Sequence, residues 1–185
     1  MKRADLAHIL RAAADIVGDA QIIVIGSQAV LATVSEGQLP DAATMSVEAD
    51  IAFLYDPDAS KADAVEGGIG EGSQFHRTFG YYAQGVDETT AQFPAGWRDR
   101  LIEFEHPDSG SARAVCPEIH DLVISKLLAG REKDRDFATA LVSNGFVKVD
   151  TLADRARSLD VAPSQRRRVE SLVASLRRHV TDRSG

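Results

Sequence analysis

The chain is poor in cysteine, in aromatic residues and in long apolar runs. Its 185 residues include one cysteine, Cys116, which excludes a disulfide within the chain. No run of about 18 apolar residues and no charged-then-apolar leader is present, so we expect neither a membrane span nor a secretory signal. A cytoplasmic protein is the simplest expectation. Cys116 stands beside a proline, and such a residue is more often a packed small side chain than a nucleophile.

The remaining composition is that of an ordinary globular protein, with 44% hydrophobic and 26% charged residues. This length is sufficient for one well-buried core with a small helical appendage. The net charge of −7 argues against a protein that coats nucleic acid nonspecifically.

Charge is unevenly distributed along the chain. Residues 151–185 contain eight Arg and four Asp or Glu, so the overall −7 divides into +4 there and −11 for residues 1–150. The basic end could contact RNA or phosphate, or its arginines could simply form the solvated faces of helices.

The stretch that organises the chain is an apolar run at residues 46–54 with two carboxylates, Glu48 and Asp50, at its start. In a strand, these side chains leave the same face about 7 Å apart at the backbone and can converge on one cation or a metal pair. The alternative is that both acids form the wet face of a half-exposed strand. The opposite face would supply the burial, through Val47, Ala49 and Ile51.

A second signal lies upstream, where the β-branched run 21–25 ends in Gly26 and Ser27 and is followed by a helix-compatible segment. A strand that runs into a helix start presents free N–H groups and a hydroxyl at the positive end of a helix dipole, which suits a phosphate. The glycine would let the phosphate approach closely. Together with the acid pair, this pattern resembles the signature of the nucleotidyltransferase superfamily that includes DNA polymerase β.

Hydrophobic periodicity, glycines and prolines predict the other elements. We expect a loop at 35–44 and a mobile glycine-rich turn at 67–72, with Pro117 as the first residue of a helix that ends at Gly130. The further predicted helices are 4–17, 59–68, 150–159 and 164–180, and the further strands are 81–86, 100–105 and 112–116, the last as a hairpin partner.

Lys126 breaks the apolar stripe of the helix that starts at Pro117, because it shares a face with Ile119 and Val123. We therefore predict that its ammonium lines a pocket. The alternative is a lysine whose stem covers apolar surface while its charge reaches solvent.

Residues 121–134, read together with Gly26-Ser27 and Glu48-x-Asp50, resemble the nucleotidyltransferase family related to the AbiEii and MenT toxins. The stretches 69–73, 79–86 and 94–97 are also similar to that family, and the likeness covers about residues 20–145. It implies an α/β (α+β) fold of the polymerase β type, in which helices flank a mixed sheet. Residues 1–145 would form the core, and 146–185 an Arg-rich helical extension of the same domain.

The resemblance also implies roles for individual residues. Gly26 and Ser27 would hold a nucleoside triphosphate, and Glu48, which stands where Asp is usual, would bind two magnesium ions together with Asp50. The catalytic and nucleotide-binding set would be completed by Lys126, Arg131, Lys133 and Asp134.

Two further ideas rest on position alone. Glu103 and Glu105 are candidates for a third carboxylate, or they are surface residues of an edge strand. His76, in a polar stretch after the glycines, is a candidate for proton transfer or is incidental.

The expected function is magnesium-dependent transfer of a nucleotide from an NTP to RNA, at a tRNA end, by the toxin of a toxin–antitoxin pair with a cognate antitoxin as partner. One alternative is a protein or small-molecule acceptor. The other is a catalytically silent module that binds a nucleotide or a partner.

Overall fold

A five-stranded mixed sheet forms the centre of the computed structural model, which describes residues 1–183. The strand order is β3-β2-β1-β5-β4. β1 pairs antiparallel with β2 and parallel with β5, β2 pairs parallel with β3, and β4 pairs antiparallel with β5. Each of the five observed strands lies within one of the predicted strand ranges. The predicted hairpin partner, β5, does pair antiparallel with β4. Their bounds are β1 Gln21–Val24, β2 Glu48–Phe53, β3 Tyr82–Gly85, β4 Ile102–Phe104 and β5 Arg113–Cys116.

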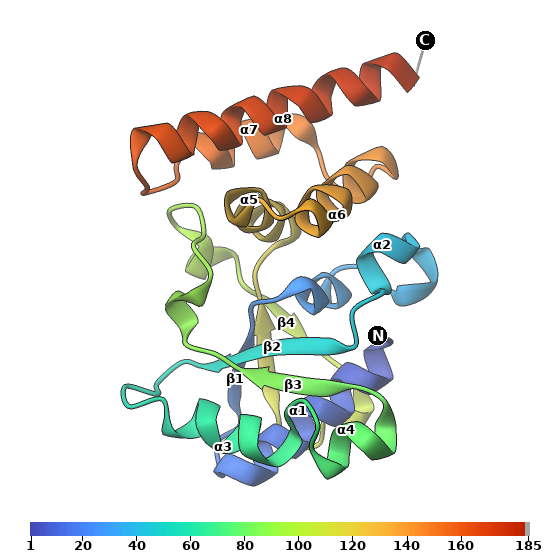
Figure 1. The fold of residues 1–185 in the computed structure, drawn as a ribbon, viewed down its shortest axis with the longest axis vertical. Coiled ribbons are helices and arrows are strands. Elements are labelled where there is room, and N and C mark those ends of the chain that lie inside the picture. The colour runs from blue at the N-terminus through green and yellow to red at the C-terminus, as the bar shows by residue number, and fades with distance from the viewer. Residues whose placement is uncertain (184–185) are drawn as a thin grey trace.

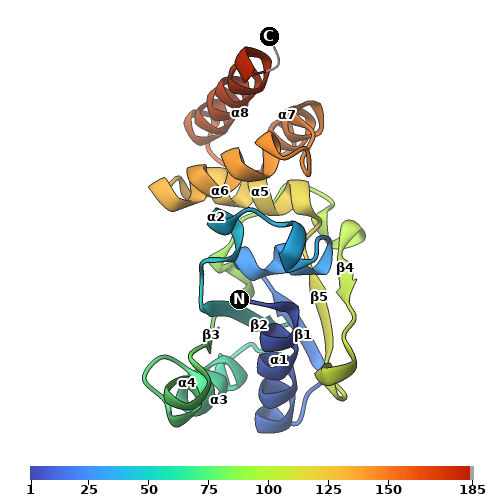
Figure 2. The same cartoon turned by 90° about the vertical axis from the view of Figure 1, so that its right-hand side faces the viewer.

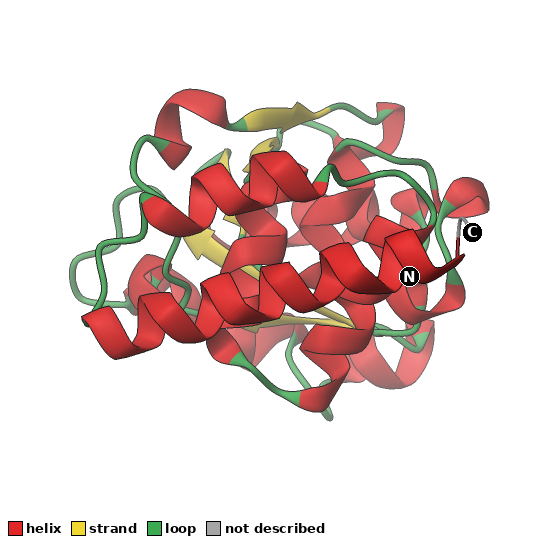
Figure 3. Ribbon diagram, turned by 90° about the horizontal axis from the view of Figure 1, so that it is seen from above, coloured by secondary structure: helices red, strands yellow, loops and turns green. Residues whose placement is uncertain are grey.

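Helices flank this sheet on both sides (Figure 1). On one side lie α1 (Arg3–Val17), α3 (Ser60–Ile69) and α4 (Gln74–Phe79). On the other side lie α5 (Ile119–Ala129) and α6 (Glu132–Ser143), with α7 (Val149–Arg157) and α8 (Pro163–Arg183) outermost (Figure 2). Seen from above, α8 crosses the whole molecule (Figure 3). The short elements are α2 Asp41–Thr44 and the 3₁₀ helices η1 Ser27–Ala32, η2 Glu36–Gln38, η3 Glu88–Thr90, η4 Trp97–Arg100 and η5 Pro107–Ser109.

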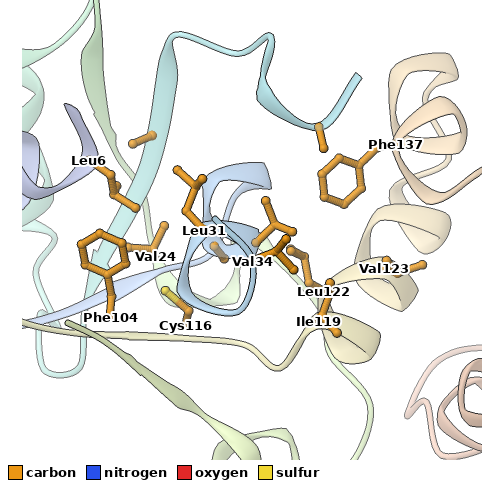
Figure 4. Close-up of a cluster of buried hydrophobic side chains, with 14 of the residues drawn as sticks. Leu6, Val24, Leu31, Val34, Phe104, Cys116, Ile119, Leu122, Val123 and Phe137 are labelled. Atoms are coloured by element: carbon orange, nitrogen blue, oxygen red, sulfur yellow. The ribbon is translucent and has the colours of Figure 1, made fainter. Parts of the chain in front are cut away.

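Alternation along β2 separates the core from the acid pair. Ala49, Ile51 and Phe53 join the main hydrophobic core, whereas Ala52 joins a smaller cluster on the other face. Figure 4 shows the main core, where η1, β5 and α5 meet. The predicted contribution of Val47 to this burial is wrong: its side chain is 47% exposed, since it precedes the first paired residue of the strand.

Cys116 lies in the same core and is fully buried. Burial raises the pKa of its thiol to about 12, so a reactive thiolate is disfavoured. This agrees with the expectation of a packed small side chain.

Helix α5 begins at Ile119, two residues later than the predicted start at Pro117. Its N-cap is Glu118, whose side chain accepts a hydrogen bond from the His120 N–H at 3.0 Å. Its end is confirmed at Gly130, whose φ of 74° is the left-handed conformation that glycine adopts without strain. The sharp turn that Gly130 makes brings α6 back beside α5.

The predicted helix at 59–68 is confirmed as α3, and the glycine-rich turn predicted at 67–72 therefore begins only after Ile69. Gly67 and Gly68 lie inside α3, where a Cβ on Gly68 would come within 2.8 Å of Ile16 Cδ1. A side chain at this position would require the exposed Ile16 side chain to move, so the glycine favours the close approach of α3 to α1. The predicted loop at 35–44 likewise contains η2 and α2.

Helices α7 and α8 contribute Leu152, Ala156, Val169 and Val173 to the main core. The predicted boundary between a core at 1–145 and an extension at 146–185 stays a prediction. Among the described residues, no helix is both long enough and apolar enough to cross a membrane.

The carboxylate of Asp121 links α5 to η4 and to α7. Its fully buried carboxylate accepts hydrogen bonds from Arg100 Nε and Nη2, at 2.8 and 3.0 Å, and Arg155 Nε lies 3.2 Å away. One carboxylate on α5 thus pairs with a cation from η4 and another from α7, which offsets the cost of burying its charge.

Candidate active site

Glu48 and Asp50 project from the face of β2 opposite its core residues, into a cavity of about 650 Å³. Residues from the sheet, from η1 and from α5, α6 and α8 line this cavity, which we call the acid pocket. The Ile25 N–H donates to the Asp50 carbonyl at 3.1 Å, which fixes the end of β1 against β2 just before Gly26 and Ser27.

The two carboxylates of the acid pair repel each other in a partly buried site. Burial, a hydrogen bond with Glu48 and the like charge of Glu48 raise the pKa of Asp50 from 3.8 to about 6, against the opposing pull of Lys126 and Arg131. Tyr82 donates its hydroxyl to Glu48 Oε2 at 3.0 Å, and burial together with this bond raises the pKa of Tyr82 to about 12. The pocket therefore concentrates negative charge that a bound cation would relieve.

Gly26 touches the acid pair directly. A Cβ at this position would lie 1.9 Å from Asp50 Oδ2, so no other residue fits without displacing that carboxylate. The structure thus gives a second reason for glycine besides the approach of a phosphate. Ser27 lines the acid pocket, and the helix expected to follow Gly26 is a six-residue 3₁₀ helix that begins at Ser27.

The opposite wall of the acid pocket carries positive charge. Lys126 on α5, only 12% exposed, lies with its Nζ 3.8 Å from Asp134 Oδ1. Arg131 Nε donates to Asp134 Oδ2 at 2.8 Å, and Lys133 lines the same cavity. Burial lowers the pKa of Lys126, while the hydrogen bond to Asp134 raises the pKa of Arg131.

The structure brings together Ser27, Glu48, Asp50, Lys126, Arg131, Lys133 and Asp134 as lining residues of one cavity. Lys126 therefore lies on the inward stripe predicted for it. Gly26 lies directly against the Asp50 side chain.

The proposed third carboxylates lie elsewhere. Glu103 and Glu105 are exposed on and beside edge strand β4, where they line a separate cavity. Sheet order explains this, because two strands separate β4 from β2. Within the described residues, no group of three or more His, Cys, Asp or Glu side chains is arranged to hold a metal.

His76 does not line the acid pocket. Its Nδ1 accepts the Gly72 N–H at 3.0 Å, and its ring packs on Tyr82 with centroids 4.6 Å apart. His76 thus holds the turn into α4 and supports Tyr82, which argues against a direct part in proton transfer.

Comparison with known proteins identifies the family of the chain. Residues 4–182 match the model of a family described as a nucleotidyltransferase of unknown function (DUF6036). The chain belongs to this family. Its mixed five-stranded sheet flanked by helices is consistent with a nucleotidyltransferase fold. No curated protein and no solved structure gives a match to the chain.

Sequence reasoning missed two residues beside the acid pair of this nucleotidyltransferase. In the register of β2 with β3, Tyr82 lies opposite Glu48 and Gln84 lies opposite Asp50. Their spacing of two residues in a predicted strand matches that of the acids, which is a usable signal. The pairing of the two strands could not be read from either segment alone.

Sequence reasoning also missed the rim of the acid pocket. Met45, 75% exposed, lies on one side, and Gln165 of α8 contributes from the outer layer. The segment after β3 adds a polar stretch composed of Thr89, Thr90, Ala91 and Gln92.

Proposed function

We propose that this protein is a magnesium-dependent nucleotidyltransferase that moves a nucleotide from an NTP to a hydroxyl of an RNA acceptor. The observation that carries the proposal is one cavity in which two strand-borne carboxylates face three cationic side chains, Lys126, Arg131 and Lys133. A volume of about 650 Å³ is in the range of small-molecule and cofactor sites.

The donor set fits magnesium. Glu48 and Asp50 supply hard carboxylate oxygens, the ligands that Mg²⁺ takes together with waters and substrate phosphates. When bound there, one or two magnesium ions would neutralise charge on the attacking and leaving oxygens. Gly26 keeps the space that the Asp50 carboxylate occupies.

The other residues of the acid pocket would bind and orient the triphosphate. Lys126, Arg131 and Lys133 would pair with its anionic oxygens, and the Ser27 hydroxyl lies within the same cavity. Asp134 is a positioning residue: its buried carboxylate holds the side chains of Lys126 and Arg131. Positioning and charge neutralisation would carry the rate, since nucleotidyl transfer needs no covalent intermediate on the protein.

The decisive experiment incubates the protein with each α-labelled NTP, total RNA and magnesium. We expect labelled RNA from the wild type and loss of nearly all labelling from Asp50→Asn, because a metal clamp acts as a unit. Wild-type labelling by Asp50→Asn would refute the assignment of β2. Label in protein or small molecules would identify the other acceptor classes, and NTP binding without turnover would identify a silent module.

An RNA acceptor is favoured by the arginines of α8, the helix that also supplies Gln165 to the acid pocket. Arg167 and Arg178 are both exposed and are 11 residues apart, which places them on one helical face. Arg168 and Arg177 have structural partners, since they donate to the Leu128 carbonyl and to Asp150.

Reversing the charge of Arg167 and Arg178 leaves those structural contacts intact. We expect an Arg167→Glu, Arg178→Glu variant to lose RNA labelling and to keep NTP binding. Wild-type labelling should weaken steeply with salt, with a slope set by the number of phosphates neutralised. The matched control, Lys2→Glu with Arg113→Glu, makes the same charge change at exposed residues away from α8 and should label RNA normally. Equal labelling by both variants would count against delivery of RNA by α8.

A toxin role, with a tRNA end as target and an antitoxin protein as partner, is the finer proposal that the resemblance to AbiEii and MenT supports. It predicts that induced wild-type protein arrests growth and that Asp50→Asn does not. Continued growth with active wild-type enzyme in the cell would reject it. The expected cytoplasmic location stays a prediction.

A further inference from the structure

The side chain of Gln84 lies beside both carboxylates of the acid pair. Strand register sets it opposite Asp50, on the face of β3 away from the buried Ala83. With its amide nitrogen turned toward the acids, Gln84 donates to Glu48 Oε1 at 2.8 Å and to Asp50 Oδ1 at 3.2 Å. One neutral side chain thus bridges both carboxylates of the acid pocket.

The chemistry of a primary amide gives this contact a second state. An amide has two N–H donors at one corner and a carbonyl oxygen at the other, and half a turn about its last torsion exchanges them. Beside two carboxylates the donor corner is favoured. Beside a divalent cation held by the same carboxylates, the oxygen corner is favoured, because amide oxygens are hard ligands.

We propose that Gln84 is the third protein ligand of the divalent cation bound by Glu48 and Asp50, and that its amide turns over when the cation binds. This inference rests on the proposed function, because it assumes that the acid pair holds a metal. It also explains how the site can work without a third carboxylate: the residue on β3 opposite Asp50 is a neutral oxygen donor instead of an acid.

A neutral third ligand has a consequence for affinity. The protein supplies two formal negative charges instead of three, so the metal-free pocket has less repulsion to overcome and the bound cation is held less tightly. Full occupancy would then depend on the phosphates of the NTP as further ligands. The cation and the nucleotide should bind cooperatively for this reason.

The test measures Mn²⁺ binding to the metal-free protein by electron paramagnetic resonance, without nucleotide or turnover. If Gln84 is a ligand, Gln84→Met should weaken binding about tenfold or more, and Gln84→Glu should tighten it by a similar factor. If Gln84 only donates N–H groups to the acids of the metal-free pocket, Gln84→Met should bind Mn²⁺ as tightly as the wild type or more tightly, since it removes hydrogen bonds that the cation must displace. Wild-type or tighter binding by Gln84→Met would therefore overturn the proposal.

Two controls separate this inference from the proposed function. Gln21→Met makes the same substitution at an exposed glutamine of β1 and should bind Mn²⁺ like the wild type. Asp50→Asn should lose binding. Loss in Asp50→Asn with wild-type affinity in Gln84→Met would reject the role of Gln84 alone, whereas wild-type affinity in Asp50→Asn would reject the acid pair as a metal site.

Nuclear magnetic resonance gives a direct view of the turnover. The side-chain amide signals of Gln84, assigned by their absence from Gln84→Met, should shift when Mg²⁺ is added, because the amide protons leave the carboxylates. The amide signals of Gln21 should stay in place. Unchanged Gln84 signals at saturating Mg²⁺ would overturn the proposed turnover.

Discussion

Replacing Asp50 with asparagine is expected to stabilise the metal-free protein while it removes metal binding. Burial and the neighbouring Glu48 raise the pKa of the Asp50 carboxyl from 3.8 to about 6. A carboxyl whose folded pKa is raised binds protons more tightly when folded. It therefore lowers the stability of the folded state progressively as the pH rises from about 4 to about 6, with the full penalty at higher pH.

The magnitude follows from the two pKa values. A rise from 3.8 to about 6 corresponds to about 3 kcal/mol of folding free energy above pH 7, and to less than about 1 kcal/mol at pH 4. Asparagine has nearly the same shape, keeps an oxygen for the Gln84 amide at the Oδ1 position and carries no charge. For a chain of this size, the Tm in EDTA at pH 8 should rise by roughly 6–12 °C.

The assay is urea and thermal denaturation of both proteins in EDTA from pH 4 to pH 8, repeated with magnesium. The gain should grow with pH, and it should shrink with magnesium, since only the wild type is stabilised by the cation. The control Glu103→Gln removes an exposed carboxylate outside the acid pocket and should change stability by less than about 0.5 kcal/mol. A variant no more stable than wild type at pH 8, or a gain that does not depend on pH, would refute the reasoning.

Three further predictions concern single side chains. Asp121→Ala should cost about 3–5 kcal/mol by urea denaturation, because it leaves Arg100 and Arg155 without their buried partner; a loss below 1 kcal/mol would show that water replaces the carboxylate. Gly26→Ala places a Cβ 1.9 Å from Asp50 Oδ2, so it should abolish Mn²⁺ binding by displacing that oxygen, and retained affinity would contradict the close packing. Lys126→Met keeps the buried stem but removes the charge, so calorimetry should show NTP affinity at least about tenfold lower with little change in Tm; unchanged affinity would place the phosphates elsewhere.

Features with a local cause could be predicted from the sequence. Side chains alternate along any strand, so Glu48 and Asp50 had to share one face once residues 48–53 were extended. Helical phase likewise put Lys126 on the inward stripe of α5, and the charges at 131–134 followed from the same segment. Gly130 marked the helix end because a left-handed residue is needed there.

Features that depend on distant segments needed the tertiary structure. The approach of β3 to β2 decided that Gln84 meets the acid pair, and sheet order decided that Glu103 does not. Asp121 lies in the first turn of α5, a common position for an acid, and only the packing of η4 and α7 against α5 makes it a buried partner of two arginines. Strand pairing and helix docking follow from the burial of the whole apolar surface, and no single segment contains that information.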